Sequence, residues 1–305
     1  MKIGLIDLDT SHPANWVPIL RDMGHEITGV CDAGAVHPAG YAERFAAEHG
    51  IPEVYSSASE LAENVDCAIV HSCNWDTHIE SARPLVEAGK AVLIDKPLAG
   101  NVRDLRQLAA WAARGARIGG GSSLRFCAEV REWFERPLEH RGTPHTVICG
   151  CGVDEFNYGI HAYSLLLGIM GGGVCAVRHL GKDRQRSIQV RWSDGRTGML
   201  VIGESAAWLP FHATIVTEKS VTHLQPDPSR LYAALLGAVM PALAGNSDAV
   251  ELTPDERIAP ELCALAAKQS WENDDIEVRL EEVAPETAYH GAEFAQSYRK
   301  QRYPQ

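Results

Sequence analysis

Three groups of residues in this chain have side chains suited to chemistry. Lys96 follows the apolar run AVLI and Asp95, so its ammonium stands where a buried strand ends and can hydrogen-bond a substrate oxygen. His161 lies in the apolar segment GIHAYSLL, and an unperturbed imidazole pKa of about 6.5 suits proton transfer at neutral pH. The third group is the turn DLDTSH at 7–12. These groups predict acid–base chemistry near an anion-binding turn.

The elements that must position these groups fall into two parts of the chain with different hydrophobic patterns. Up to about residue 122, short apolar runs alternate with helical patterns at 13–23, 39–49, 58–64, 77–89 and 101–114. This alternation predicts βαβ units and a parallel sheet of Rossmann type, an α/β domain over 1–122 whose ligands sit at the carboxyl ends of the strands.

Beyond residue 122 the apolar stretches are longer and rich in β-branched residues. Asp194-Gly195 between two of them is a hairpin signal, and helical patterns follow at 229–244 and 254–271 before the closing strand IEVRLEEV. These features predict an α+β domain over 123–305, built on a largely antiparallel open sheet.

Charge and composition exclude several classes of function. The formal charge of −12 disfavours nucleic acid as a partner, and no apolar stretch reaches the roughly 20 residues of a membrane span. No signal peptide is recognisable, so we expect a cytoplasmic protein.

The eight cysteines are scattered along the chain, which predicts reduced, buried thiols. Cys149 and Cys151 share one strand face, but no second pair of cysteines or histidines with zinc spacing accompanies them. We therefore expect no metal site.

Two segments closely resemble the Gfo/Idh/MocA oxidoreductase family. Residues 66–99 contain the turn Ser72-Cys73-Asn74, then His78, then the element Asp95-Lys96-Pro97, and residues 156–171 read FNYGIHAYSLLLGIMG. The tail from 251 to 280 resembles the family's closing helix and strand. The resemblance implies an NAD(P)-binding first domain, a second domain that presents a sugar, cyclitol or similar polyol, hydride transfer at a hydroxyl or ketone, and a homo-oligomer.

The resemblance also assigns roles to individual residues. It makes Lys96 and His161 the catalytic pair, with Asn157 beside them, and places Trp75, Arg125, Tyr158 and His161 at the substrate. The cofactor groove would be formed by Asp7, Leu8, Asp9, Thr10, Ser11, His12, Asp32, Ser72, Cys73, Asn74, His78, Asp95 and Lys96. The alternatives are ordinary: Lys96 as a solvated lysine, His161 as a core histidine, and Asn74 as a turn residue.

Asn157 departs from the family pattern, which has an aspartate four residues before the histidine. An amide can orient the His161 ring but supplies no charge to favour the imidazolium. Asp154 or Glu155 could supply the missing carboxylate, or both could lie in a solvated loop.

The phosphate turn departs further, since Asp7, Asp9 and His12 stand where the family has glycines. Asp32, twenty-five residues after Asp7 (32 − 7), has the spacing of an acid that receives the adenosine ribose and favours NAD over NADP; the alternative is a surface turn. Each carboxylate near a pyrophosphate costs about 1 kcal/mol, and the helix N-terminus returns ~0.3–1 kcal/mol. The turn therefore predicts weak NAD binding, or a helix cap with none.

Two classes of function follow from these features. The first is an NAD(P)-dependent oxidoreductase acting on a polar small molecule. The second is a diverged, non-redox member, either a lyase or isomerase that uses Lys96 and His161 as acid and base or a catalytically silent partner subunit, with dinucleotide binding weak or lost.

Overall fold

A six-stranded parallel sheet forms the first half of the computed structural model, which describes residues 1–246 and 252–304. The strands lie in the order β3-β2-β1-β4-β5-β6, the predicted doubly wound topology. They are β1 (Lys2–Ile6), β2 (Glu26–Cys31), β3 (Glu53–Val54), β4 (Cys67–Val70), β5 (Ala91–Ile94) and β6 (Ile118–Gly120). The central strands β4 (CAIV) and β5 (AVLI) are buried along their whole length, since helices cover both faces of the sheet.

The helices that connect these strands begin and end within two residues of the predicted ranges. They are α1 (His12–Asp22), α2 (Tyr41–His49), α3 (Ala58–Asn64), α4 (His78–Glu87) and α5 (Val102–Ala113). The side chains of Ser57 and Asn101 cap α3 and α5 by accepting hydrogen bonds from backbone N–H groups of the first turn. Serine and asparagine are preferred at this position, in keeping with the predicted starts of both helices.

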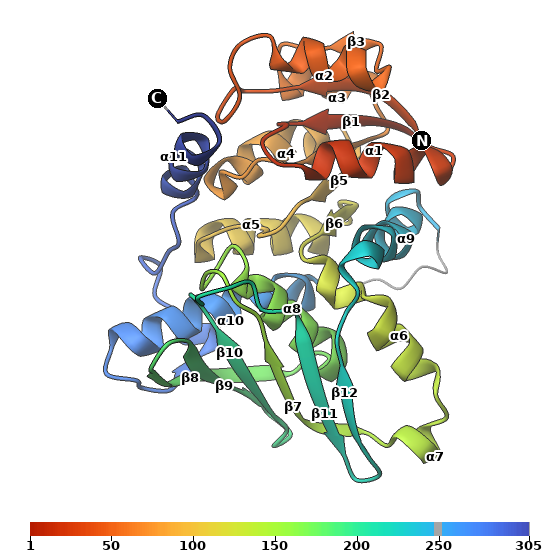
Figure 1. Cartoon of the computed structure of the whole chain (residues 1–305). Helices are drawn as coiled ribbons and strands as arrows, with labels where there is room; N and C mark the ends of the chain where they lie inside the picture. The colour runs from red at the N-terminus through yellow and green to blue at the C-terminus, as the bar shows by residue number, and fades with distance from the viewer. Residues whose placement is uncertain (247–251, 305) are drawn as a thin grey trace.

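A second, mixed sheet follows in the order β12-β11-β7-β10-β9-β8-β13. Its strands are β7 (Pro144–Gly150), β8 (Val174–Lys182), β9 (Arg186–Trp192), β10 (Thr197–Ile202), β11 (His212–Thr217), β12 (Val221–Leu224) and β13 (Val278–Arg279). Within this second sheet, β7–β10 is the one parallel pair among the described strands, and the predicted Asp194-Gly195 turn joins β9 to β10. Helices α8 (Gly159–Met170) and α10 (Pro254–Glu272) pack on this sheet, and α10 also contacts α5 (Figure 1).

Several elements after residue 122 differ from the predicted ones. The closing strand is only Val278–Arg279, followed by the 3-10 helix η4 (Leu280–Glu282). Two helices that were not predicted, α6 (Ala128–Glu135) and α7 (Leu138–Arg141), precede the first strand of the second sheet. Helix α9 (Leu231–Leu243) returns to the first sheet, where it packs on α1, β5 and β6. A further helix that the sequence did not reveal, α11 (Gly291–Arg302), lies at the carboxyl ends of the first sheet's strands (Figure 1). None of the described helices is long and apolar enough to cross a membrane.

Candidate active site

A cavity of about 300 Å³ lies where the two sheets' domains meet. Its lining comes from the carboxyl end of β5, the start of α1, the start of α8, the start of α9 and the loop before β11. Polar groups on its wall are His12, Asp95, Lys96, Ser123, Tyr158, His161 and Tyr232. The size suits a small molecule, and the two predicted catalytic residues, Lys96 and His161, lie in the same lining.

Lys96 stands directly after β5 and reaches across to the loop before α8. Its Nζ donates to the side-chain oxygen of Asn157 at 2.9 Å and to the backbone oxygen of Asn157 at 3.2 Å. Burial lowers the pKa of Lys96, although the nearby carboxylates of Asp95 and Asp154 work against this. Both acceptors are neutral, and an ammonium has three N–H donors. The third donor has no acceptor among the described residues and is left for a ligand.

His161 is held by Ser122, which the sequence reasoning missed. The Ser122 hydroxyl and Nδ1 of His161 are hydrogen-bonded at 2.7 Å, leaving Nε2 as the other ring nitrogen. Burial and then the positive charge of Lys96 keep the pKa of His161 well below its usual value. The ring is therefore neutral at neutral pH. Ser122 follows the glycines at the carboxyl end of β6, a position that the strand-end rule could have found.

Asn157 does not have the position that the sequence suggested. Its side-chain oxygen bonds Lys96, and Ser122 orients His161 in its place. Asp154 accepts hydrogen bonds from the backbone N–H groups of residues 156 and 158, both at 2.9 Å, and so shapes the loop. Glu155 pairs with Arg186 and Lys182, away from the histidine.

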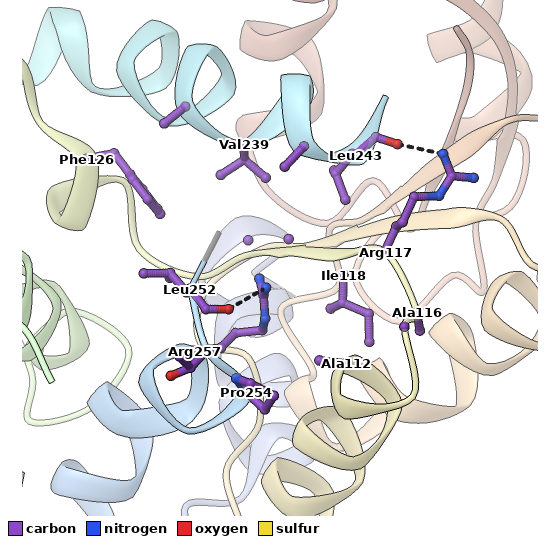
Figure 2. Close-up of a pocket in the computed structure, with 16 residues that line it drawn as sticks. Ala112, Ala116, Arg117, Ile118, Phe126, Val239, Leu243, Leu252, Pro254 and Arg257 are labelled. Carbon is purple, nitrogen blue, oxygen red and sulfur yellow. Dashed lines mark hydrogen bonds between the residues drawn. The ribbon is translucent and has the colours of Figure 1, made fainter. Parts of the chain in front are cut away.

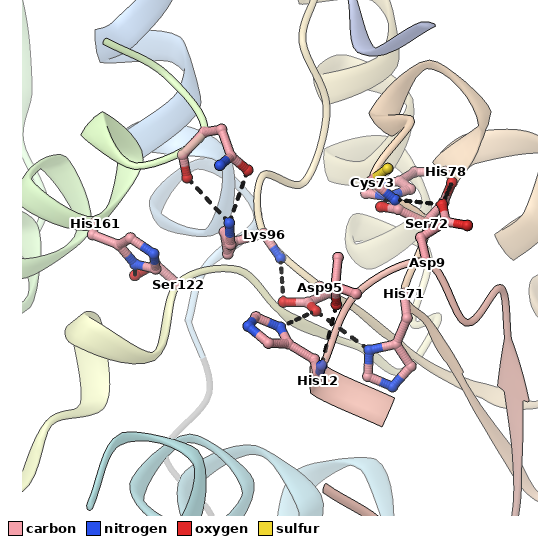
Figure 3. A network of polar contacts seen from close by, with 12 residues as sticks. Asp9, His12, His71, Ser72, Cys73, His78, Asp95, Lys96, Ser122 and His161 are labelled. Carbon is pink, nitrogen blue, oxygen red and sulfur yellow. Dashed lines mark hydrogen bonds and ion pairs between the residues drawn. The ribbon is translucent and has the colours of Figure 1, made fainter. Parts of the chain in front are cut away.

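Asp95 is the centre of a buried polar network (Figure 3). Its Oδ2 lies 2.5 Å from Nδ1 of His12 and 3.3 Å from Nδ1 of His71, and its Oδ1 accepts the backbone N–H of Lys96 at 2.7 Å. Burial alone would raise the pKa of Asp95, but the bonds and charges of the two histidines outweigh it and hold this pKa well below the usual value. Asp95 is therefore ionised.

An ionised Asp95 fixes which nitrogen of the His12 ring donates to it. Because the carboxylate accepts at Nδ1, this nitrogen carries a proton, and Nε2 is the ring nitrogen that Asp95 does not bind. The His12 ring stacks on Trp16 at 5.7 Å and meets Tyr232 edge-on at 5.1 Å, so its plane is fixed on the cavity wall. Sequence reasoning assigned His12 to the cofactor turn; the structure brings it to the cavity that Lys96 and His161 share.

His71, the other donor to Asp95, was missed as well. It follows β4 directly, again at a strand end, and burial lowers its pKa so that the ring is neutral. Its Nε2 has no hydrogen-bond partner among the described residues, and the ring makes a T-shaped contact with Trp16, with ring centres 4.9 Å apart.

Asp7 begins the turn that follows β1. It takes a left-handed backbone conformation, with φ of 60°, and its carboxylate accepts the backbone N–H of Ala33 at 3.0 Å. Burial raises the pKa of Asp7 to about 7; the Ala33 bond opposes this, and the charges of Asp9 and Asp32 add to it.

Asp9 is fully buried and ties the end of β1 to the end of β4. One carboxylate oxygen accepts from the backbone N–H of Cys73 at 2.9 Å and from the Ser72 hydroxyl at 3.2 Å. The other oxygen has no hydrogen-bond partner among the residues that the structure describes. The neighbouring Leu8 is also fully buried.

The remaining residues predicted for the cofactor groove serve the chain's own turns. Asp32 accepts the backbone N–H of Gly34 at 3.0 Å, and Asn74 caps the 3-10 helix η1 (Trp75–Thr77). His78 is buried, with its ring nitrogens 3.1 Å from the carbonyl of Leu98 and 2.9 Å from that of Ser72. The Thr10 hydroxyl accepts the backbone N–H of His12 at 3.2 Å, and Ser11 is exposed at the start of α1.

These contacts do not fit a dinucleotide. Its pyrophosphate needs open backbone N–H groups at the β1–α1 turn and the neighbouring strand end. Here the N–H groups of Ala33 and Cys73 already donate to Asp7 and Asp9, and both carboxylates are buried within the turn. A pyrophosphate would have to displace these bonds.

Two residues predicted to border the substrate lie elsewhere. Trp75 is buried, donates its indole N–H to the carbonyl of Tyr289 at 2.7 Å and packs edge-on against Phe156. Arg125 donates to the carbonyl of Glu256 at 2.6 Å, beside a different cavity. Tyr158 does line the candidate site, with its ring centre 5.6 Å from Nζ of Lys96.

A second cavity, of about 310 Å³, lies between β6, α9 and the start of α10 (Figure 2). Arg117 donates to the carbonyl of Leu243 and Arg257 to that of Leu252, so both guanidinium groups brace the backbone. Among the described residues, no histidine or carboxylate lines this cavity, so they place no acid–base pair there. The described residues also contain no group of three or more histidine, cysteine or acidic side chains placed to bind a metal ion.

Residues 4–118 match the family model described as the oxidoreductase family with an NAD-binding Rossmann fold, Gfo/Idh/MocA. The first domain belongs to the Gfo/Idh/MocA oxidoreductase family. A 72-residue segment is 39% identical to rabbit (Oryctolagus cuniculus) trans-1,2-dihydrobenzene-1,2-diol dehydrogenase, covering 23% of this chain and 22% of that protein. This chain spans only 22–42% of the length of the first two curated relatives that it matches.

Solved structures of similar fold extend over nearly the whole chain. A probable dehydrogenase from Thermotoga maritima superposes with a TM-score of 0.79 at 18% identity, covering 93% of this chain and 100% of that one. Myo-inositol dehydrogenase from Lactobacillus casei, solved with NAD(H) and myo-inositol, gives a TM-score of 0.77 at 14% identity, covering 92% and 96%. At these identities the likeness establishes the fold alone, a parallel Rossmann sheet followed by a mixed, mostly antiparallel sheet.

Proposed function

We propose that this chain moves protons on a small polar molecule bearing hydroxyl or carbonyl groups, in the cavity between its two domains, as an isomerase or lyase does. The observation that carries the proposal is the 2.5 Å bond between His12 and Asp95, on a cavity wall shared with Lys96. A base oriented by a buried carboxylate, next to a cation, is the arrangement that proton abstraction beside a carbonyl requires.

The roles of the groups follow from their hydrogen bonds. Nε2 of His12, the ring nitrogen that Asp95 does not bind, takes a proton from a carbon or hydroxyl of the substrate, and Asp95 stabilises the imidazolium that forms. The free N–H of Lys96 hydrogen-bonds the substrate oxygen on which negative charge develops. His161, neutral and fixed by Ser122, stands in the same lining and exchanges a proton with a second substrate hydroxyl.

The lining favours a ring-shaped polyol or hydroxyketone. The cavity is lined by five aromatic side chains besides its few polar groups: Trp16, Tyr158, Trp208, Phe211 and Tyr232. Such a pocket packs the C–H face of a ring while the polar groups select its hydroxyls. The relatives' names agree with this class, since they are dehydrogenases of a cyclic diol and of myo-inositol.

A second candidate is the NAD(P)-dependent oxidation or reduction of a hydroxyl or ketone on a sugar, cyclitol or similar molecule. The family match over residues 4–118 favours it, and Lys96 and His161 would serve it equally well. Asp32 would favour NAD over NADP. The bonds of Asp7 and Asp9 within the turn make it the weaker candidate.

Deuterium exchange separates the two candidates. The protein is incubated in D₂O with a panel of cyclic ketoses, inososes and hydroxyketones without any dinucleotide, and substrate C–H signals are followed by NMR. We expect exchange with at least one compound, slowed about 100-fold or more in His12→Gln but unchanged in His145→Gln, whose ring is exposed on β7. Turnover seen only with added NAD(P)(H), through the nicotinamide absorbance, would favour the second candidate.

A further inference from the structure

Helix α11 crosses the edge of the first sheet at which a Rossmann domain holds its dinucleotide. At its start, the backbone N–H of Ala292 donates to the carboxylate of Asp76 at 3.0 Å, in the 3-10 helix that follows β4. Near its end, Arg299 donates to the carbonyls of Gly34 and Ala35, both at 3.3 Å, in the loop that follows β2. Because β1 lies between β4 and β2, the helix passes over the carboxyl end of β1.

The length of the helix is sufficient for this crossing. Its 12 residues span roughly 18 Å, whereas two strand spacings amount to about 10 Å. In Figure 1 the helix lies beside α4 and the loop after β2, in line with this path.

The middle of α11 fills the space between the two loops with apolar side chains. Ala295 is 5% exposed and forms a buried cluster with Val36, which follows β2, and Cys73, which follows β4. Phe294 and Tyr298 pack at the margin of this cluster. The crevice at the switch between β1 and β4 is where the doubly wound fold binds dinucleotides, and here side chains of the chain itself occupy its mouth.

A second connection joins the end of α11 to the phosphate turn. Burial, and then the charge of Arg302, lowers the pKa of His37, so the ring is neutral and has one N–H. Its Nε2 lies 3.0 Å from the carbonyl of Leu8 and its Nδ1 lies 2.7 Å from the Tyr303 hydroxyl. Nε2–H therefore donates to Leu8, and Tyr303 donates to Nδ1. The ring also stacks on Tyr41 with centres 3.6 Å apart.

We infer that α11 and Asp9 together close the dinucleotide crevice of this chain. Asp9 accepts hydrogen bonds from the Cys73 N–H and the Ser72 hydroxyl at the end of β4, where a pyrophosphate would need donors. Helix α11 covers the surface between this point and the end of β2, where an adenosine would lie. The crevice is thus a packing interface between the carboxyl-terminal helix and the first domain. The inference concerns binding alone, so it stands or falls separately from the chemistry at the cavity.

Calorimetry with variants tests the two barriers. NAD⁺, NADH, NADP⁺ and NADPH at up to about 1 mM are titrated into the wild type, Asp9→Gly, Ala295→Arg and the double variant. Ala295→Arg displaces the helix, because a large charged side chain does not fit the buried cluster of Ala295, Val36 and Cys73. Gln296→Arg, at the next residue and on the exposed face, is its matched control. We expect no binding to the wild type or the control, and binding to the double variant at least about tenfold tighter than to either single variant.

Hydrogen exchange of residues 291–302 shows whether the helix has moved, and circular dichroism shows that each variant is folded. Exchange in α11 should rise in both Ala295→Arg proteins and remain slow in Asp9→Gly. Tight NADH binding to the wild type, with or without release of α11, would overturn the inference. A folded double variant with a released helix that binds no dinucleotide would overturn it equally, because then neither barrier is what excludes the cofactor.

Discussion

Replacing Asp7 by asparagine should change how the stability of this protein depends on pH. Asn keeps the shape of the side chain, the acceptor for the Ala33 N–H and a residue type that tolerates the left-handed backbone of position 7. The pKa of Asp7 is about 7 in the folded protein against 3.8 as its ordinary value. The folded state therefore holds this proton more tightly than the unfolded chain.

The sign and size of the effect follow by linkage. A raised pKa contributes stability that is fully present below about pH 4 and is lost as the pH rises to about 7, the pKa of folded Asp7. The whole difference, about three pKa units at 1.36 kcal/mol each, is worth ~4 kcal/mol, of which ~3 kcal/mol falls between pH 5 and pH 8. The free energy of unfolding of Asp7→Asn should therefore gain ~3 kcal/mol relative to the wild type over this range.

Urea unfolding at several pH values measures this gain. Asp22→Asn, at an exposed position at the end of α1, is the matched control and should follow the wild-type curve. Parallel curves for wild type and Asp7→Asn would refute the reasoning, since they would mean that Asp7 is ionised in the folded protein without cost.

Three further predictions concern the cavity. Asp95→Asn should release His12 from its Nδ1–H tautomer, visible in ¹⁵N NMR, and lower turnover about 100-fold or more, because the base loses its orienting carboxylate. Lys96→Ala and His161→Ala should each lower turnover by about 100-fold or more, through loss of a positioned donor and of a proton carrier. Asn157→Asp should raise the pKa of Lys96, because a carboxylate would then lie where the amide oxygen lies 2.9 Å from Nζ, and the alkaline limb of the pH–rate profile should move upward.

Controls for these variants come from exposed positions of the same residue types. Lys219→Ala, in the hairpin between β11 and β12, and His145→Ala, on β7, should leave turnover unchanged. Rates within a few-fold of wild type in both Lys96→Ala and His161→Ala would remove those residues from the chemistry. An alkaline limb that stays in place or moves downward in Asn157→Asp would contradict the pairing of Asn157 with Lys96.

The positions of single residues along the chain were enough to find most of the strand ends. Lys96 and Asp95 follow a wholly apolar run, and such runs become buried parallel strands whose carboxyl ends converge, so the first sheet and Lys96 at its edge were predictable. The same rule applied to the ends of β4 and β6 would have found His71 and Ser122. The hairpin at Asp194-Gly195 was equally local, because its turn chemistry depends on two adjacent residues.

Partnerships across the chain were decided only by the tertiary structure. Asn157 precedes His161 by four residues, yet it bonds Lys96, because the loop that shapes its backbone turns it toward β5. His12 is 83 residues from Asp95, and the helix α11 rests on loops more than 200 residues earlier. The sequence determined which residues stand at the ends of the strands, since strand burial and turn formation are local. Only the folded chain determined which of those ends face one another, because that depends on packing between segments whose separation no local pattern encodes.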